Sequence, residues 1–331
     1  MGGWSPEAPI SLNSGRNVFS ALNPEKYIKR AVILTKERQA ILLDEGEEPS
    51  EENLARQKAS SMAETFATIM RWKAEAALLA LHGCGGEDGA FQGFLATLGL
   101  PFTHSGVTAS AVAMDKAIAK LLYEKAGVRT PRGVVLIEGD DPVSKVAKAD
   151  LAYPLIAKPN ASGSSFGLWL IKTPEELLQT APKFWEHGAE YLLEEFISGR
   201  EFTCVVLSRQ GRAVAMPVTE IISHTGDLFD FKAKYSKGSS EEITPADIDI
   251  ELSDRIREAA LKCHLALGCR GASRTDFMVS ASGRPYALET NTIPGMSAAS
   301  ILPKVVVAAG YTFSETLDEM LSEALSSKDK N

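Results

Sequence analysis

The sequence is poor in cysteine, has no long apolar run and carries no excess of positive charge. Four cysteines among 331 residues do not suggest a disulfide framework, and they lack the C-x-x-C pairs and further ligands of a structural zinc site. No apolar stretch approaches the roughly 20 residues of a membrane-spanning helix. A net charge of −8 argues against a nucleic-acid-binding protein, which needs a basic face. We therefore expect a cytoplasmic protein that binds neither membranes nor nucleic acids.

Hydrophobic residues make up 44% of the chain, enough to bury more than one core. In the first hundred residues, strand-like stretches alternate with helical ones. The strand-like stretches are 31–34, 76–83 and 100–104, and the helical ones are 11–22, 58–71 and 89–99. This alternation is typical of an α/β fold and predicts a parallel sheet with helices on its faces.

After residue 126 the pattern changes to strands that follow one another as hairpins. One long helix over 108–126, with Thr108 as its N-cap, precedes them. The expected strands are 132–138, 153–159, 166–172, 191–197, 201–208, 212–222, 272–280 and 284–291. Further helices are expected from Pro174, over 253–267 and twice near the C-terminus. The whole pattern predicts three α/β (α+β) pieces.

Polar side chains interrupt two of these strands, in the stretches SRTDFMVS and YALETN. Arg274 and Asp276 share one face of the first strand, and Glu289 and Asn291 share one face of the second. A hairpin would bring Asp276, Glu289 and Asn291 together as a partly buried oxygen cluster. Such hard ligands suit a magnesium ion that carries a nucleotide phosphate. The alternative is an ordinary salt-bridge network around Arg274.

A second motif is the glycine- and serine-rich turn in AKPNASGSSFG, which follows Lys158 at the end of a strand. Backbone N–H groups in such a turn form a concave anion site, and a lysine adds a point charge for phosphate. A plain β-hairpin with solvent-facing serines is the alternative. The chain has no G-K-[ST], so this turn is not a P-loop.

Two weaker motifs complete the set. In LHGCGGEDGAFQG the G-x-G-x-x-G spacing fails at Asp88, but His82 lies where open α/β sheets bind ligands. In LLEEFISGREF, Glu194, Glu195 and Glu201 flank a strand-to-strand hinge and suit a nucleobase amino group and a ribose hydroxyl. A structural histidine and surface carboxylates are the respective alternatives. The order of lysine, loop, hinge and oxygen cluster is the order that an ATP cleft needs.

Together, LHGCGGEDGAFQG, MDK, AKPNASGSSFG, LLEEFISGREFT, KAKY, SRTDFM and LETNTIPGM resemble the ATP-grasp ligases, specifically the D-alanine–D-alanine ligase family. The resemblance covers essentially the whole chain in family order. It implies a three-domain ATP-grasp ligase: a Rossmann-like N-terminal substrate domain (1–104), a central ATP-grasp subdomain (105–193) and a C-terminal catalytic domain (194–331). The last two would clasp ATP between them.

The resemblance also assigns site residues. The cofactor set binds ATP through its phosphates, adenine and ribose, and comprises Lys116, Lys158, Lys234, Glu194, Glu195, Ile197 and Glu201. The metal set holds two magnesium (or manganese) ions and comprises Asp276, Glu289 and Asn291. The substrate and catalytic set comprises Glu7, Ser164 and Tyr235 for the first D-alanine, His82 beside it, Ser300 for the second D-alanine, and Arg274 with the Gly295 N–H for the transition state.

The implied activity is ATP-dependent ligation of two D-alanines through an acyl phosphate, for peptidoglycan synthesis, by a homodimer. A mobile lid over 224–240 would keep water from the acyl phosphate. Tyr235 favours the dipeptide, because ester-forming relatives usually have Phe there. One alternative is another ATP-grasp carboxylate–amine ligase, of D-Ala–D-Ser or D-Ala–D-Lac type. The other is a nucleotide-binding regulator without catalysis, against which the intact Arg274, Asp276, Glu289 and Asn291 argue.

The opening MGGWSPEAPISLNSG departs from the family pattern. The family places an apolar strand directly before this glycine pair, and we expect the N-terminal sheet to lack that first strand. A start site assigned too late is the explanation we favour over a real truncation. The family's acidic-basic-acidic trio is Glu7-Ala8-Pro9 here, which keeps the glutamate and loses its charged neighbours.

Overall fold

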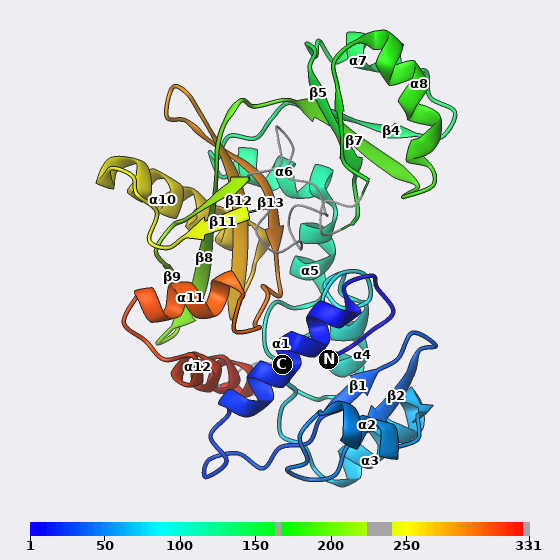
Figure 1. Cartoon of the computed structure of the whole chain (residues 1–331), viewed down its shortest axis with the longest axis vertical. Helices are drawn as coiled ribbons and strands as arrows, with labels where there is room; N and C mark the ends of the chain where they lie inside the picture. Colours follow the sequence, from blue (N-terminus) through cyan, green and yellow to red (C-terminus); the bar gives the residue numbers. More distant parts are fainter. Residues whose placement is uncertain (163–166, 224–239, 327–331) are drawn as a thin grey trace.

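The computed structural model describes residues 1–162, 167–223 and 240–326, and these residues form an elongated molecule organised around three sheets (Figure 1). The N-terminal residues lie at one end, a small sheet with two helices lies at the other, and the largest sheet lies between them. The mixed helix-and-sheet class expected from the sequence is confirmed. None of the described helices is both long and apolar enough to cross a membrane.

The N-terminal part combines a small antiparallel sheet, in the order β1-β2-β3, with four helices. The helix α3 begins with a capping box, in which the side chains and backbones of Ser61 and Glu64 bond each other reciprocally. The elements are α1 (Ala8–Ala21), β1 (Val32–Leu34), β2 (Gln39–Leu42), α2 (Glu51–Arg56), β3 (Ser60–Ser61), α3 (Met62–Arg71) and α4 (Ala90–Thr97).

Parallel pairing in this part takes the form of two isolated bridges, Gly2 with Leu34 and Ala77 with Phe102. The expected strands at 76–83 and 100–104 are therefore not regular strands. Hydroxyl side chains take the place of ladder partners: Thr103 Oγ1 accepts from the Leu79 N–H (3.1 Å), and Ser11 Oγ donates to the Ala80 carbonyl (2.5 Å).

The long helix expected over 108–126 is two helices, and that expectation was wrong. Asp115 has an extended backbone (ψ 99°) and its side chain accepts from the Ile118 N–H, so it ends one helix and caps the next. The N-cap of the first is Gly106, not Thr108. The helices are α5 (Val107–Met114) and α6 (Lys116–Lys125). The break makes Lys116 the first residue of α6.

The central module is an antiparallel four-stranded sheet, in the order β4-β7-β5-β6, covered by two helices. It has its own apolar core, in which the Phe184 ring stacks on Tyr191 at 4.2 Å between centroids. Its elements are β4 (Gly133–Ile137), α7 (Pro142–Lys148), β5 (Leu155–Pro159), β6 (Trp169–Ile171), α8 (Pro174–Phe184) and β7 (Glu190–Glu195).

The largest sheet has the order β11-β10-β8-β12-β13, with β9 also paired to β8. The single strand expected over 212–222 is divided into β9 and β10 around Pro217, which has no N–H for the ladder. The strands of this sheet are β8 (Gly199–Arg209), β9 (Arg212–Ala215), β10 (Thr219–Ser223), β11 (Ser240–Ile243), β12 (Ala272–Ser280) and β13 (Pro285–Asn291). The helices of this part of the chain are α10 (Ile250–Leu267), α11 (Ile301–Ala308) and α12 (Phe313–Ser326).

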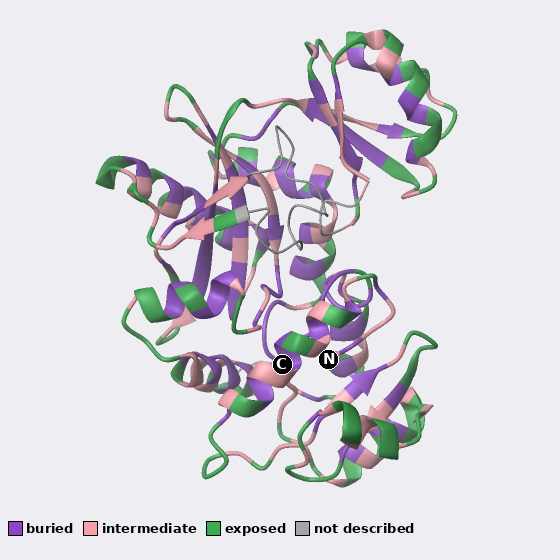
Figure 2. Ribbon diagram, in the orientation of Figure 1, coloured by how far each residue is buried: buried purple, intermediate pink, exposed green. Residues whose placement is uncertain are grey.

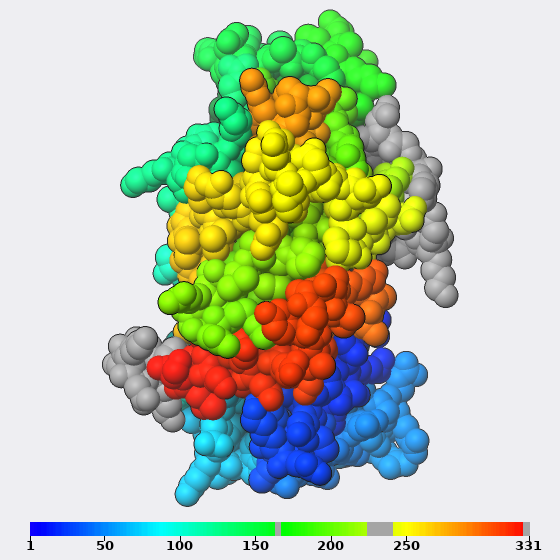
Figure 3. All heavy atoms as spheres, turned by 90° about the vertical axis from the view of Figure 1, so that its left-hand side faces the viewer, coloured from blue at the N-terminus to red at the C-terminus, as the bar shows by residue number. Residues whose placement is uncertain are grey.

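Buried residues run through all three parts (Figure 2) and fall into distinct cores. One core joins α5, α6 and α10 to the largest sheet. Another joins α11 and α12 to α1, α3 and α4, and Figure 3 shows these C-terminal helices lying directly against the N-terminal residues. The domain boundaries at residues 104 and 193 stay predictions.

Candidate active site

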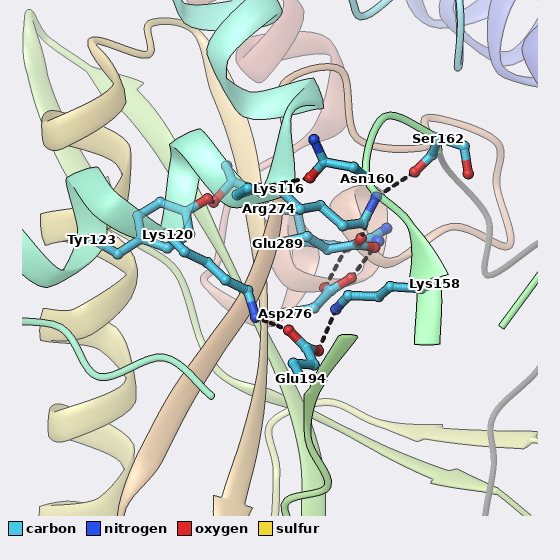
Figure 4. A network of polar contacts seen from close by, with 12 residues as sticks. Lys116, Lys120, Tyr123, Lys158, Asn160, Ser162, Glu194, Arg274, Asp276 and Glu289 are labelled. Carbon is cyan, nitrogen blue, oxygen red and sulfur yellow. Dashed lines mark hydrogen bonds and ion pairs between the residues drawn. The ribbon is translucent and has the colours of Figure 1, made fainter. Parts of the chain in front are cut away.

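A network of charged side chains lies where α6, the central sheet and the β12–β13 hairpin meet (Figure 4). The cations are Lys116, Lys120, Lys158 and Arg274, and the carboxylates are Glu194, Asp276 and Glu289. Four cations against three carboxylates leave a formal charge of +1. A mostly buried network with excess positive charge suits an anionic ligand such as a polyphosphate.

The β12–β13 hairpin places its polar residues in facing pairs, Asp276 opposite Glu289 and Arg274 opposite Asn291. Arg274 holds the Asp276 carboxylate with two hydrogen bonds of 2.9 Å, one to each oxygen. Thr203 Oγ1 of β8 donates a third, of 2.6 Å, to Oδ1. The hairpin expected from the sequence therefore forms. One of its expected oxygen ligands, Asp276, is already bound by the guanidinium of Arg274 on the same strand.

The donor types of this hairpin fit a magnesium or manganese ion. Asp276 and Glu289 supply carboxylates and Asn291 an amide, all hard oxygen ligands. The Asn291 amide nitrogen is buried without a hydrogen-bond partner, so no hydrogen bond of that nitrogen opposes a turn of the amide toward a cation. Across residues 1–162, 167–223 and 240–326, no three acidic, histidine or cysteine side chains form a ready-made metal cluster. Both carboxylates instead face protein cations, Arg274 and Lys116.

Lys116, at the start of α6, reaches from the helix toward two other segments. Its ammonium lies 3.3 Å from Glu289 Oε2 and donates to the Ser162 carbonyl at 2.5 Å. Burial lowers the pKa of Lys116, and nearby Lys158 lowers it further, while Glu289 opposes both. Lys116 thus links the hairpin to the glycine- and serine-rich turn.

Lys158 and Lys120 share one carboxylate, that of Glu194. Lys158, at the end of β5, contacts Oε1 at 2.6 Å, and Lys120, one turn along α6 from Lys116, binds Oε2. Burial lowers the pKa of Lys120 to about 8. Burial by itself would raise the pKa of Glu194, but the two lysines outweigh it and the pKa is lowered. Lys120 was missed at the sequence level, although its i+4 spacing from Lys116 puts both on one helix face.

Asn160 fastens the turn that follows Lys158 to the start of α6. Its side-chain oxygen accepts from the Ala117 N–H (2.9 Å), and its NH₂ donates to Asp115 (2.9 Å) and Glu190 (3.0 Å). Its carbonyl accepts from the Lys116 N–H at 3.1 Å. Every polar group of this buried side chain is therefore satisfied between the central sheet and α6.

The remaining expected hinge residues have neighbours of their own. Glu195 is bound to Arg132, with contacts of 2.8 Å to the guanidinium Nε and 2.7 Å to Nη2. Ile197 follows β7 in the connection to β8 and is half-buried. Glu201 lies in β8, opposite Ile221 of β10. Of the expected adenine set, Glu194 belongs to the charged network formed by the described residues.

A second buried polar cluster lies between the N-terminal part and the loop after β13. The His82 ring contacts Ser14 Oγ at 2.9 Å through Nε2 and the Ile293 carbonyl at 3.1 Å through Nδ1. Burial lowers its pKa to about 4, so the imidazole is neutral at pH 7. Glu87 accepts from the N–H groups of Gly83 (2.9 Å) and Ile293 (3.0 Å).

Glu7 belongs to the same cluster. A Cβ on Gly83 would lie 2.2 Å from Glu7 Oε2, so only glycine allows this carboxylate so close. Burial and the Glu7 charge raise the pKa of Glu87 to about 8. Glu7, His82 and Glu87 thus surround a glycine-rich loop beside the polar loop that contains Gly295.

The loop after β13 is held from both sides. The Met296 N–H donates to Ser14 Oγ (3.1 Å), and Asn17 donates to the Met296 carbonyl (2.7 Å). Within the loop, Ser300 Oγ accepts from the Ser297 N–H (3.1 Å) and lies against Gly295, where a Cβ would be 2.8 Å from it. Ser164, Lys234 and Tyr235, and nearly all of the expected lid, lie outside the described residues.

Two protein-family models match the chain. A model described as "D-ala D-ala ligase N-terminus" matches residues 1–105, and one described as "D-ala D-ala ligase C-terminus" matches residues 122–322. The D-alanine–D-alanine ligase of Methylorubrum populi is 38% identical, over 98% of this chain and 96% of its own.

Solved structures match over the same extent. The VanG D-Ala:D-Ser ligase from Enterococcus faecalis superposes with a TM-score of 0.82 at 31% identity, covering 98% of this chain and 97% of its own. The D-alanine–D-alanine ligase from Bacillus anthracis complexed with ATP has a TM-score of 0.75 at 30% identity, covering 100% and 97%.

Proposed function

The chain belongs to the D-alanine–D-alanine ligase family, and from this membership we propose that it joins two D-alanines into D-alanyl-D-alanine, at the expense of ATP, for peptidoglycan synthesis. The observation that carries the proposal is the match of both family models, which together extend over nearly the whole chain. The charged network between α6, the central sheet and the β12–β13 hairpin supplies the matching chemistry.

ATP is assigned to the charged network. Lys116 and Lys158 are proposed to bind its phosphates, and their burial beside the glycine- and serine-rich turn supports this role. Glu194, Glu195 and Ile197 are proposed to bind adenine and Glu201 the ribose. Lys234, outside the described residues, is proposed to reach the γ-phosphate. A solved structure of a family relative is an ATP complex, which supports ATP as the nucleotide.

Asp276, Glu289 and Asn291 are the residues that would hold magnesium or manganese ions. Bound there, such ions would neutralise charge on the transferring phosphate. The protein's own part is to hold these three side chains on one rigid hairpin and to keep Arg274 beside them. Arg274 and the Gly295 N–H are proposed to stabilise the negative charge that develops during the reaction.

The chemistry needs two steps because a carboxylate is a poor acylating agent. The first D-alanine's carboxylate takes the γ-phosphoryl group of ATP and releases ADP; the second D-alanine's amine then attacks the acyl phosphate and releases phosphate. Glu7, with Ser164 and Tyr235, is proposed to hold the first amino group, and neutral His82 is proposed to lie beside it. Ser300 is proposed to hold the carboxylate of the second D-alanine.

The test is ADP formation with ATP and magnesium against a panel of D-amino acids, with the product identified by mass spectrometry. We expect ADP formation to require D-alanine and to yield the dipeptide. D-Serine and D-lactate as second substrates test the two related ligase types. ATP turnover that does not depend on D-alanine would contradict the proposal, and binding without turnover would favour the regulator.

We also propose that the protein is a cytoplasmic homodimer, as the family resemblance implies. Light scattering on the purified full chain gives its molar mass directly. A mass of one chain at micromolar concentration would contradict the dimer without affecting the proposed activity.

A further inference from the structure

Glu194 is held by two lysines from different parts of the molecule. Lys158 belongs to β5 of the same sheet as Glu194, whereas Lys120 belongs to α6, which packs in the core of the largest sheet. Each lysine takes a different oxygen of the carboxylate (Figure 4). We infer that Lys120 is a positioning residue for nucleotide-base selection, which keeps Glu194 ionised and aimed to accept a hydrogen bond from the 6-amino group of adenine.

The inference rests on the proposed function. Both Lys120 and Lys158 bind Glu194, but the proposed function gives Lys158 a second partner, the phosphates of ATP. Lys158 is assigned to the phosphates, so nucleotide binding draws its ammonium away from Glu194. Lys120 reaches no other acid within hydrogen-bond distance among the described residues, and its side chain is 7% exposed. It therefore remains as the counter-ion of Glu194 when Lys158 is engaged.

A buried carboxylate without a counter-ion takes up a proton. The Glu194 side chain is 3% exposed, so solvent cannot replace a missing lysine. Protonated Glu194 would present an O–H donor to the base, and the N–H of a 6-amino group needs an acceptor. Lys120 thus determines whether Glu194 acts toward the nucleotide base as a hydrogen-bond acceptor or as a donor.

An ionised Glu194 has acceptor capacity left for the base. A carboxylate has about four lone-pair sites, and the two lysines occupy one on each oxygen. Adenine carries a donor at its 6 position, where guanine carries an acceptor that the carboxylate would repel. The expected result is preference for a 6-amino purine, and this preference depends on the charge of Lys120.

The experiment compares ATP with purine riboside triphosphate, which has hydrogen in place of the 6-amino group. The wild type should prefer ATP by about tenfold or more in kcat/KM, the range for a hydrogen bond to a charged group. Lys120→Met should reduce the preference to about twofold or less. Lys120→Arg should restore most of it. Lys125→Met removes an exposed lysine from the same helix and should leave the preference unchanged.

A double variant shows whether Lys120 acts through Glu194. In a Glu194→Gln background, adding Lys120→Met should change the preference by less than about twofold, because the carboxylate it serves is gone. Unchanged preference in Lys120→Met, whatever happens to its KM for ATP, would overturn the inference. If Lys120→Met does not fold by circular dichroism, Lys120→Gln keeps a donor without charge and is judged by the same preference. A wild type that turns over neither nucleotide would contradict the proposed function instead.

Discussion

Arg274 and Asp276, two residues apart on β12, are joined by two hydrogen bonds of 2.9 Å that fix the guanidinium in one plane. Thr203 holds the same carboxylate from β8, so neither charge can turn without breaking a contact. A cation fixed in this way needs no reorganisation when negative charge develops beside it. For the role proposed for Arg274, the planar shape of its guanidinium should therefore matter as well as its charge.

Replacing Arg274 with lysine tests this. Lysine keeps the charge but cannot make the two-pronged contact, so its ammonium is free to turn away. We expect Arg274→Lys to lower kcat by about 100-fold, in the range for loss of one fixed transition-state donor, with the KM for ATP changed by less than about threefold. Steady-state ADP formation measures both. Arg284→Lys, at an exposed position before β13, is the control; a kcat within about twofold of wild type for both variants would contradict the role.

Asn160 offers a prediction about stability. In Asn160→Ala the half-buried Ala117 N–H loses its acceptor, Asp115 keeps the Ile118 N–H but loses the Asn160 amide, and Glu190 loses one donor. We expect the free energy of unfolding to fall by about 2–3 kcal/mol. We also expect the KM for ATP to rise, because Asn160 binds Asp115 and Lys116 directly follows Asp115 in the chain. Urea unfolding measures the first effect. Asn53→Ala, which removes one exposed hydrogen bond, should stay within about 0.5 kcal/mol.

Gly85 supports Trp4 of the N-terminal loop. A Cβ on Gly85 would lie 2.3 Å from the indole, and the backbone has φ +83°, so alanine adds a clash to backbone strain. Gly46 has a similar φ of +73° but open space around it, so alanine there adds strain only. We expect about 1 kcal/mol of destabilisation for Gly46→Ala and at least about 1 kcal/mol more for Gly85→Ala. Equal values for the two variants would show that the indole moves without cost.

His264 should make stability depend on pH. Burial lowers its pKa to about 4, while its Nδ1 lies 2.8 Å from Ser273 Oγ. The unfolded chain takes up a proton near pH 6.5 and the folded chain does not, so stability falls as pH falls from about 6.5 to about 4. Between pH 7.5 and pH 5 this one group removes about 2 kcal/mol. Urea unfolding of His264→Gln should therefore lose about 2 kcal/mol less than wild type over that interval; an equal loss would contradict the assignment.

The sequence predicted the strands of the β12–β13 hairpin closely, because apolar alternation fixes strand position locally. The expected strands at 272–280 and 284–291 are Ala272–Ser280 and Pro285–Asn291 in the structure. Their facing pair, Asp276 with Glu289, follows from this register.

What the sequence did not reveal depends on partners far along the chain. Lys120 meets Glu194 74 residues away, and Glu87 meets the Ile293 N–H 206 residues away. Neither residue type signals burial by itself, because isolated Lys and Glu are mostly exposed. The break at Asp115 was missed for a different reason: one side-chain cap overrode good helix propensity on both sides.

The shared core of the first and last helices has a consequence for how the chain folds in the cell. Val18 of α1 and Leu22, which directly follows α1, pack in the same core as Leu317 and Met320 of α12. α12 leaves the ribosome long after α1, so the part of α1 that α12 covers stays uncovered while the residues between them are made. The central module closes its own core as soon as β7 has emerged. An apolar surface that is made early is thus buried late, and we expect chaperones that bind nascent chains to act there.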